Sequence, residues 1–377
     1  MGKRFIPIPG WSSNAPAARE TASKMSKKDV KPPASAESGV LVIGGGISGI
    51  VAALELARLG IPVTIIEKEA SLGGLAASFC CKASEACNKC FACVVDKRIR
   101  EVTERNDIFI LTQTELKELT GVPGAYRATV NNAGKIFSLN VSALVVAVGI
   151  DPFDAAIKGE YGYGVLKNVV TARDLEEMLR LRGGVLRPSD GSLPLKIAFF
   201  QCVGSRDQAA GNLYCSQACC AYALRLIRAI RHKYPEINMA FLYMDIQPAG
   251  VDFSAFLSDC RQDVNIRFVR SIPSKVYHVP KTDSLRVRLA DPDQGEVREE
   301  IFDMVVLSVG MVLKRGARSL AEQLEIGFDE DGFLAEPRIA RGVFVTGACT
   351  GPKDIDCSIT QAKSSAVQVY QFLLGRS

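Results

Sequence analysis

Short apolar runs alternate along this chain with longer stretches of helical periodicity. Seven apolar runs lie at residues 40–43, 62–66, 144–149, 196–200, 239–243, 304–310 and 342–347. Runs of this length predict buried strands. Apolar positions recur at helical spacing over 172–181, 216–232 and 360–374. Strands that alternate with helices predict an α/β architecture.

The first 38 residues lack such a pattern. They are rich in Ser, Ala, Pro and Lys and include the only tryptophan, Trp11. A segment of this composition buries too little apolar surface to fold alone, so we expect a disordered N-terminal tail over 1–38. Folded sequence is expected to begin at Gly39.

A glycine-rich turn follows the first predicted strand. Gly44, Gly46 and Gly49 form a Gly-x-Gly-x-x-Gly pattern that opens a helix, and Glu67 ends the next strand 18 residues after Gly49. In such a strand, helix, strand unit the glycines allow a tight turn, close approach to a pyrophosphate and close helix packing. The helix N-terminus would bind the phosphates, and Glu67 would bind ribose hydroxyls. The candidate dinucleotide contacts here are Gly44, Gly46, Ser48, Gly49, Glu67 and Lys68.

FAD and NAD sites share this glycine pattern, so the choice between them rests on a resemblance carried by later glycines. Gly73-Gly74 after Glu67, Gly149 at a strand end, and Gly347 after the run 343–346 resemble flavoproteins of the thioredoxin reductase type, which have two dinucleotide-binding domains. The resemblance implies FAD, with the helix from about Ser358 reaching the flavin ring and Asp354 among the cofactor contacts. It also implies a Rossmann-like FAD domain split into 39–155 and 305–377 around an inserted domain, 156–304.

Composition limits the functions that the chain can have. Hydrophobic residues make up 47% and charged residues 23%, and the formal net charge is +5, too small on this length to indicate nucleic-acid binding. No run reaches the roughly 18 apolar residues of a membrane span, and the start lacks a secretory signal, so we expect a cytoplasmic protein. The 2 His residues make His-based hydrolysis or metal binding unattractive.

Nine of the 12 cysteines fall into two groups, Cys80, Cys81, Cys87, Cys90 and Cys93, then Cys202, Cys215, Cys219 and Cys220. In a cytoplasmic chain such cysteines are more often metal ligands or redox groups than disulfides. The strand at 196–201 runs into Cys202 where a second nucleotide site would have a glycine-rich turn, which argues against NAD(P)H there. Four thiolates suffice for a [4Fe-4S] cluster, but Cys219 and Cys220 would diverge by about 100° on a regular helix. The spacing alone leaves buried core cysteines equally open.

Two longer motifs surround the second cysteine group. They are Phe200-Gln-Cys-Val-Gly-Ser-Arg-Asp207 and Tyr214-Cys-Ser-x-x-Cys-Cys220, and the residues 243–246 and 351–355 add to them. These motifs resemble the heterodisulfide reductase A subunit family over most of 39–377. The resemblance implies FAD, one [4Fe-4S] cluster on Cys202, Cys215, Cys219 and Cys220, and electron transfer to partner subunits. The extra ferredoxin domains of the longest family members are absent from this sequence.

The first cysteine group departs from that family pattern. Cys87-x-x-Cys90-x-x-Cys93 has the opening spacing of a bacterial ferredoxin motif without its fourth Cys-Pro. Cys80 or Cys81 would complete a second cluster, with Cys81, Cys87, Cys90 and Cys93 as the candidate set. The alternatives are a redox-active dithiol of Cys87 and Cys90, or thiols without such a role.

The functional prediction is therefore an FAD and iron-sulfur oxidoreductase that works within a complex. It would convert two-electron flavin chemistry to one-electron transfer in a heterodisulfide-reductase-like or quinone-linked complex of sulfur or energy metabolism, and a homodimer fits the family. Arg225 and Lys353 are candidates for a positive charge near the flavin, with an ordinary surface or phosphate-facing charge as the alternative. The rival functions are an NAD(P)H-dependent disulfide reductase using Cys87 and Cys90, and a non-catalytic flavin-binding scaffold.

Overall fold

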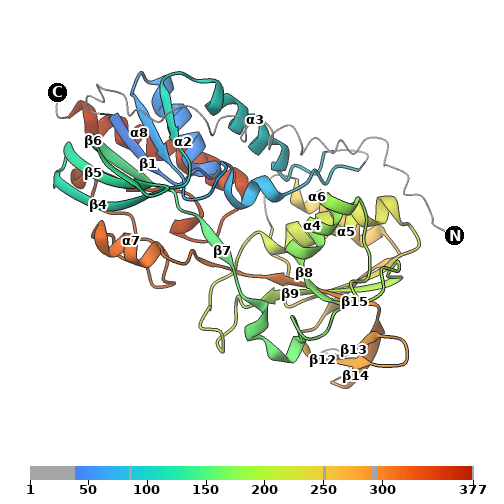
Figure 1. Ribbon diagram of the computed structural model, residues 1–377. Helices are drawn as coiled ribbons and strands as arrows, with labels where there is room; N and C mark the ends of the chain where they lie inside the picture. The colour runs from blue at the N-terminus through green and yellow to red at the C-terminus, as the bar shows by residue number, and fades with distance from the viewer. Residues whose placement is uncertain (1–38, 85–86, 249–251, 291–294, 376–377) are drawn as a thin grey trace. The chain divides into compact units, whose positions relative to one another are not determined.

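The computed structural model describes residues 39–84, 87–248, 252–290 and 295–375 (Figure 1). The tail expected at 1–38 lies outside the described residues. The chain forms two compact units. The first consists of residues 39–78, Phe91–Asp151 and 312–375, and the second of Phe79–Cys90 and Pro152–Met311.

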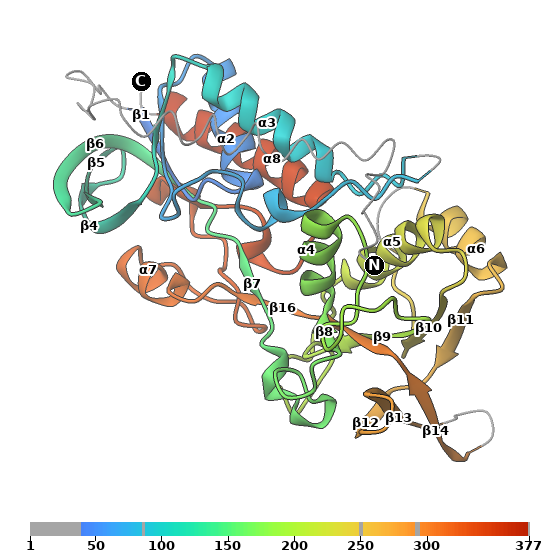
Figure 2. The same cartoon turned by 45° about the vertical axis from the view of Figure 1, so that its right-hand side comes forward.

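The first unit is built on one mixed sheet. Its strands are β1 (Gly39–Ile43), β2 (Val63–Ile66), β3 (Ile108–Leu111), β4 (Thr114–Val122), β5 (Ala125–Asn132), β6 (Lys135–Val146) and β17 (Val343–Val345). They run in the order β3-β2-β1-β6-β5-β4, and β17 also pairs with β6. The pairs β3-β2, β2-β1, β1-β6 and β6-β17 are parallel, whereas β4, β5 and β6 form an antiparallel meander that curves away from them (Figure 2).

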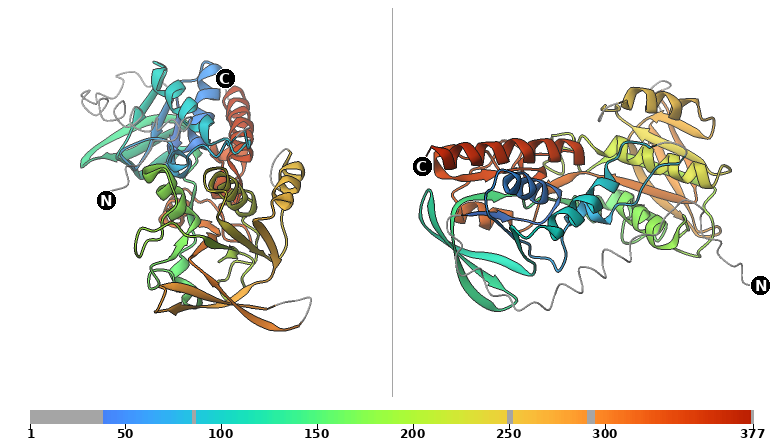
Figure 3. Two further views of the ribbon diagram at one scale, coloured as in Figure 1. Left: turned by 90° about the vertical axis from the view of Figure 1, so that its right-hand side faces the viewer. Right: turned by 90° about the horizontal axis from the view of Figure 1, so that it is seen from above.

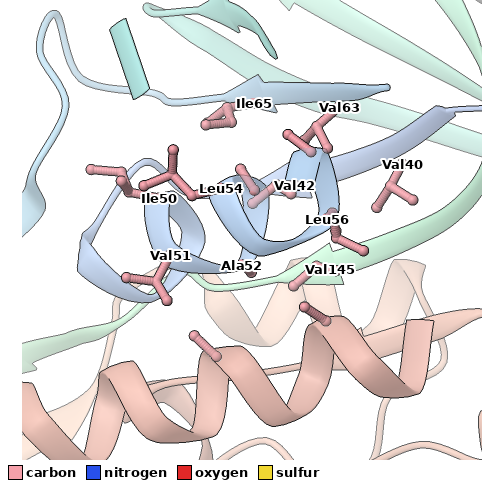
Figure 4. Close-up of a cluster of buried hydrophobic side chains, with 14 of the residues drawn as sticks. Val40, Val42, Ile50, Val51, Ala52, Leu54, Leu56, Val63, Ile65 and Val145 are labelled. Carbon is pink, nitrogen blue, oxygen red and sulfur yellow. The ribbon is translucent and has the colours of Figure 1, made fainter. Parts of the chain in front are cut away.

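Helices cover both faces of this sheet. They are α2 (Ile47–Arg58), α3 (Ala92–Glu104), α7 (Ala317–Gln323) and α8 (Ile355–Leu374), with short 3-10 turns at Gly74–Ser78, Ile339–Arg341 and Ala348–Thr350. Successive strand residues point to opposite faces. Val40 and Val42 of β1 therefore pack with α2, α3 and α8, and Figure 4 shows them beside α2. Leu41 and Ile43 pack with α7 and the meander on the other face. The ribbons of this unit can be followed from two further sides in Figure 3. Burial on both faces explains the continuous apolar run of β1.

The second unit has a parallel sheet of its own. Its strands are β8 (Val169–Thr171), β9 (Lys196–Val203), β10 (Asn238–Tyr243), β11 (Ile266–Arg270) and β15 (Met304–Val309), in the order β11-β10-β9-β15-β8. Its helices are α4 (Ala172–Arg182), α5 (Cys219–Lys233) and α6 (Phe253–Gln262), with 3-10 turns at Ala155–Ile157 and Gly159–Tyr161. These three helices lie on one face of the sheet (Figure 1).

The opposite face of the second sheet carries an antiparallel layer, β12 (Pro273–Val279), β13 (Ser284–Ala290) and β14 (Val297–Phe302). Alternation again divides the strand: Ile197 and Phe199 of β9 pack with the helices, and Ala198 and Phe200 pack with this layer. The remaining strands, β7 (Ile150–Pro152) and β16 (Met311–Leu313), form a two-stranded sheet. The α/β fold class with two Rossmann-like sheets is confirmed.

The structure differs from the expected domain boundaries at the cysteine-rich segment. The sequence predicts this segment within the first domain, 39–155, but Phe79–Cys90 packs within the second unit. The reason is a buried ion pair between Lys82 and Glu176 of α4, whose side chains are both 2% exposed. Among the described helices, none combines the length and the apolar character that a membrane crossing requires.

Candidate functional site

The glycine-rich turn of the first unit adopts a compact conformation between β1 and α2. Gly44 has φ +109°, a left-handed value that glycine favours. A Cβ atom on Gly49 would lie 1.9 Å from the Gly44 carbonyl oxygen, so only glycine lets α2 approach the turn this closely. Gly46 is the N-cap of α2 and provides no side-chain cap, and the space where its Cβ would stand is open.

Glu67 at the end of β2 is oriented by this turn. Glu67 as a whole is 6% exposed, and its carboxylate accepts hydrogen bonds from the N–H of Gly45, at 2.6 Å, and of Glu69, at 2.9 Å. Gly73 donates to the Gly45 carbonyl at 2.7 Å, and Gly74 packs on Gly46. The predicted residues Gly44, Gly46, Gly49, Glu67, Gly73 and Gly74 thus come together, whereas the Lys68 side chain is 43% exposed.

A second loop of the same unit adjoins the start of α2. A Cβ atom on Gly347, which follows β17, would lie 2.1 Å from the Ser48 hydroxyl, so the two residues are neighbours. Gly347 also donates its N–H to Gln361 of α8 at 2.9 Å. The Thr346 hydroxyl is fully buried and has no hydrogen-bond partner among the described residues. Sequence reasoning missed Thr346 and Gln361, because neither residue type marks a site without the fold.

Lys353, Asp354 and Gly149 occupy loop positions of this unit. The Lys353 ammonium donates to the hydroxyl of Thr350, at 3.0 Å, and to the carbonyls of Thr350 and Gly351. Partial burial lowers the pKa of Lys353. Asp354 is the N-cap of α8 and accepts a hydrogen bond from the Cys357 N–H at 2.8 Å. Gly149 lies three residues beyond β6, with φ +74°.

The donor set of the first unit fits a dinucleotide. The first turn of α2 leaves backbone N–H groups without intrahelical acceptors, and no side chain caps them. They face a turn in which Gly46 leaves open space and Gly44 and Gly49 remove side chains. Such a helix terminus attracts phosphate groups through its N–H donors and its dipole. The Glu67 carboxylate beside it supplies the acceptors that ribose hydroxyls require.

The second cysteine group gathers around the start of α5. Cys202 lies near the end of β9 with a left-handed φ of +59°, and Cys219 and Cys220 are the first two residues of α5. The Cys219 thiol hydrogen-bonds to both Cys202 and Cys220, and Cys215 interacts electrostatically with both of these. The side chains of Cys219 and Cys220 were expected to point in different directions from a regular helix. Both nevertheless lie close to Cys202, because all three meet at the N-terminus of α5.

Hydrogen bonds shift the pKa of these thiols in opposite directions. Interaction with Cys219 lowers the pKa of Cys202 and of Cys220, and the same contacts raise the pKa of Cys219. Burial raises the pKa of Cys215. The N–H of Gln217 donates to the Cys215 sulfur at 3.3 Å, and the Gln247 backbone donates to Cys220.

The site lies where a nucleotide would bind in a Rossmann-like domain. In such sheets ligands bind outside the carboxyl ends of the strands, with the pyrophosphate at the N-terminus of the first helix. Here β9 leads to Cys202 and α5 begins with Cys219 and Cys220. An ion pair of Arg206 with Asp245, at 2.5 Å, lies beside the thiols and influences their pKa. Buried hydroxyl and amide oxygens of Ser205 and Gln201 have no partner among the described residues.

These thiols fit a polynuclear cluster. Within the part of the chain that the structure describes, no three His, Cys, Asp or Glu side chains converge as ligands of one metal ion. A [4Fe-4S] cluster does not need that convergence, because its four cysteines bind different irons. Cys215 and Cys220 also receive backbone N–H donors, and hydrogen bonds to sulfur are a recognised means of tuning cluster potentials.

The first cysteine group is divided between the two units. Cys80, Cys81, Cys87 and Cys90 belong to the second unit, and Cys93 of α3 belongs to the first. Cys80 is half-buried, and burial with the nearby Glu176 carboxylate raises the pKa of Cys80 to about 12. Cys81 and Cys87 are exposed.

Arg225 of α5 belongs to the second unit as well. Its guanidinium donates to the Asn88 carbonyl at 2.8 Å and lies 5.6 Å from the centre of the Phe256 ring. These contacts connect Arg225 to the cysteine-rich segment, a role that its position in the sequence did not indicate.

Comparison with known proteins identifies relatives in sequence and in fold. The pyridine nucleotide-disulphide oxidoreductase family matches residues 13–188. The second of two iron-sulfur A subunits of the CoB–CoM heterodisulfide reductase of Methanopyrus kandleri is 32% identical over 87% of this chain and 63% of its own length. The A subunit of the H2:CoB-CoM heterodisulfide,ferredoxin reductase of Methanothermobacter marburgensis is 28% identical over 89% of the chain and 64% of its own length. The chain thus spans slightly less than two thirds of these relatives.

Solved structures show the same fold at low sequence identity. Thioredoxin reductase of Lactococcus lactis superposes with a TM-score of 0.61 at 16% identity, over 90% of this chain and 100% of that chain. Bacillithiol disulfide reductase of Bacillus cereus gives a TM-score of 0.56 at 14% identity, over 90% of this chain and 99% of that chain.

Proposed function

We propose that this chain, which is similar to heterodisulfide reductase A subunits, is an electron-transfer oxidoreductase subunit that binds FAD and a [4Fe-4S] cluster. FAD would occupy the glycine-rich site of the first unit, and the cluster would be bound by Cys202, Cys215, Cys219 and Cys220. The observation that carries the proposal is the gathering of these four cysteines where a Rossmann-like sheet places its ligand.

The residues of the first unit would bind and orient the FAD. The uncapped first turn of α2 would donate its N–H groups to the pyrophosphate, and Glu67 would accept hydrogen bonds from ribose hydroxyls. Ser48 and Gly347 lie side by side where the late loop adjoins α2. Lys353 is held by three acceptors of its own loop, so its charge has a fixed position there. Bound FAD would supply two-electron redox chemistry.

The residues of the second unit would hold the cluster in place of a nicotinamide nucleotide. A nucleotide site needs small residues and free N–H groups after the first strand, and here Cys202, Cys219 and Cys220 take those positions. Their burial in part excludes water, and the N–H groups of Gln217 and Gln247 stabilise negative charge on sulfur. A [4Fe-4S] cluster would supply one-electron transfer.

Together the two sites would convert two-electron chemistry to one-electron transfer. The electron partner would be a protein that carries one electron at a time, within a multi-subunit complex. The Methanothermobacter marburgensis relative is named as a subunit of a heterodisulfide,ferredoxin reductase, and ferredoxin is a protein of this kind. The complexes of sulfur or energy metabolism that contain such subunits, including quinone-linked ones, are the setting we propose. Because thiols replace the glycine-rich turn of a nicotinamide site between β9 and α5, electrons would enter and leave through proteins.

Iron and flavin analysis tests this proposal. Anaerobically purified and reconstituted protein is compared with Cys202→Ser, Cys215→Ser and the control Cys357→Ser, which changes an exposed cysteine of α8. We expect about one flavin per chain in all four proteins and a loss of about four irons and four sulfides in the first two variants. Equal iron in all four proteins would overturn the cluster assignment, and flavin-free protein would overturn the FAD assignment.

A further inference from the structure

We propose that Gln361 of α8 is a positioning residue of the FAD site: it fixes the loop between β17 and α8, and this loop holds the half of FAD that carries the flavin. The loop consists of residues 346–354 and is called the late loop here. The inference concerns the first unit alone and rests on the FAD site proposed above.

The side chain of Gln361 contacts the late loop with both ends of its amide. Its Oε1 accepts a hydrogen bond from the N–H of Gly347 at 2.9 Å, and its Nε2 donates to the hydroxyl of Thr350 at 3.0 Å. Gln361 lies in the second turn of α8, a helix of 20 residues. These two hydrogen bonds therefore connect the loop to a long regular element that packs in the core of the unit.

The Thr350 hydroxyl is the centre of this network. It accepts hydrogen bonds from Gln361 and from the Lys353 ammonium, each at 3.0 Å, and it donates to the Gly347 carbonyl at 3.0 Å. A hydroxyl has one donor and two acceptor positions, so this hydroxyl is fully used. Without the amide of Gln361, one acceptor position of Thr350 and the N–H of Gly347 would lose their partner.

Gly347 connects this network to the start of α2. It has a left-handed φ of +81°, and a Cβ atom on it would lie 2.1 Å from the Ser48 hydroxyl and 2.7 Å from the Ser48 Cβ. The loop thus lies against α2 through a residue that has no side chain. Ser48 belongs to the uncapped first turn of α2, where the pyrophosphate is proposed to bind. Gln361 therefore fixes the late loop directly beside the phosphate site.

The sheet order places the late loop and Glu67 on opposite sides of the glycine-rich turn. β2, which Glu67 follows, pairs with one side of β1, β6 pairs with the other side, and β17 lies beyond β6. These strands are parallel, so the turn, Glu67 and the late loop all lie at the same end of the sheet. With the ribose of FAD at Glu67 and its pyrophosphate at the turn, the flavin half extends toward the late loop.

A fixed loop favours binding because it loses little conformational entropy when the ligand arrives. The late loop contains two glycines with positive φ, Gly347 and Gly351, and glycine is the residue with the most conformational freedom in the unbound chain. The network of Gln361 and Thr350 restricts this freedom before FAD binds. Gln361 should therefore raise the affinity for the flavin half of FAD without contributing to the binding of the ribose and the phosphates.

Affinities for FAD and ADP test this role. Flavin-free, full-length Gln361→Leu is compared with wild type and with the control Gln371→Leu, which changes an exposed glutamine of the same helix. FAD binding is titrated by flavin fluorescence, and ADP, which has the ribose and pyrophosphate without the flavin, is titrated in competition. We expect Gln361→Leu to raise the Kd of FAD about tenfold and to leave the Kd of ADP and the urea midpoint unchanged. Gln371→Leu should match wild type.

Thr350 provides a second variant and a rescue. Thr350→Val keeps the shape of the side chain and removes its hydroxyl, so it should weaken FAD binding about as much as Gln361→Leu does. Thr350→Ser keeps the hydroxyl and should bind FAD like wild type. Because both residues act through one network, Gln361→Leu/Thr350→Val should bind FAD about tenfold more weakly than wild type, and not a hundredfold.

Unchanged FAD affinity in Gln361→Leu would overturn the inference. Equal losses of FAD and ADP affinity would overturn it too, because a general structural role of Gln361 would weaken both ligands alike. Additive effects in the double variant would show that Gln361 does not act through Thr350. The proposed function fails in a different way: wild-type protein that binds no FAD would overturn the FAD site itself, and this inference with it.

Discussion

Lys82 and Glu176 form a buried ion pair that decides where the cysteine-rich segment lies. The Glu176 carboxylate also accepts the Cys80 N–H, and the ring of Tyr222 packs on the Lys82 ammonium. Each charge in such a pair is tolerated only because the other is present. The pair therefore makes the position of Phe79–Cys90 depend on α4, a helix about ninety residues away in the sequence.

Removing one member of this pair should be costly. We expect Lys82→Ala or Glu176→Ala to lower the free energy of unfolding of the second unit by about 3–5 kcal/mol, because each leaves one charge buried alone. The double variant Lys82→Met/Glu176→Leu should cost much less than the two single changes together. Urea unfolding followed by circular dichroism measures this, and two single variants as stable as wild type would contradict the account.

Gly49 tests the dinucleotide turn at the same scale. The Cβ of Gly49→Ala would stand 1.9 Å from the Gly44 carbonyl oxygen, so α2 must move away from the turn. We expect the bound flavin per chain to fall at least tenfold. Gly159→Ala is the matched control, because its Cβ meets no atom within 4 Å and its φ is not left-handed. The ratio of flavin to protein absorbance gives the result, and normal flavin content in Gly49→Ala would show that the turn does not bind it.

At the scale of elements, the connection from β9 to α5 carries cysteines at the positions where a Rossmann-like domain would have its nucleotide-binding loop. The same strand and helix positions in a Rossmann-like domain would hold the pyrophosphate. Cys202 in its left-handed conformation and the cysteines of the first turn of α5 leave no glycine-rich cradle in this described connection. Such an exchange would suit a cluster in place of a nicotinamide nucleotide.

We therefore expect NADH and NADPH to be poor reductants of this protein. Anaerobic addition of either nucleotide at 1 mM should leave the flavin absorbance near 450 nm at least 90% unchanged over minutes, whereas dithionite should bleach it. Stopped-flow absorbance measures both reactions. Rapid bleaching whose rate saturates with nucleotide concentration would favour the rival disulfide reductase, and Cys87→Ser/Cys90→Ser would then show whether those thiols take part.

The sequence indicated some elements well and could not indicate others. The helix expected at 172–181 is α4, because apolar residues at helical spacing indicate a helix with one buried face. The strand expected at 40–43 is β1, because a continuous apolar run indicates a strand buried on both faces. Most of the meander β4-β5-β6 escaped prediction, and only the end of β6 falls in the predicted run 144–149. The exposed polar positions of β4 and β5 and the turns at Gly124 and Gly134 weaken the apolar signal. The glycine turn and Glu67 could be predicted as a site because a local unit creates it. Gln361 and Lys82 could be found only from their contacts with distant segments, and Thr346 only from the burial of its hydroxyl.

For the whole molecule, both units carry candidate redox groups. The first has the uncapped helix, the glycines and the acidic strand end that suit FAD. The second has one thiol group around α5 and another anchored along the same helix. A chain with both a two-electron and a one-electron cofactor could exchange electrons with partner proteins. It would then need no nicotinamide site, although its fold is that of disulfide reductases. The homodimer expected from the family remains a prediction.

The central claim, that Cys202, Cys215, Cys219 and Cys220 bind a one-electron cluster, is tested most directly by EPR-monitored reductive titration of the anaerobic protein. The account predicts a fast-relaxing signal of a reduced [4Fe-4S] cluster that integrates to about one spin per chain in Cys87→Ser/Cys90→Ser and vanishes when Cys215→Ser is added. A signal that survives the removal of Cys215, or iron-free protein whose only redox change is that of the flavin, would contradict it.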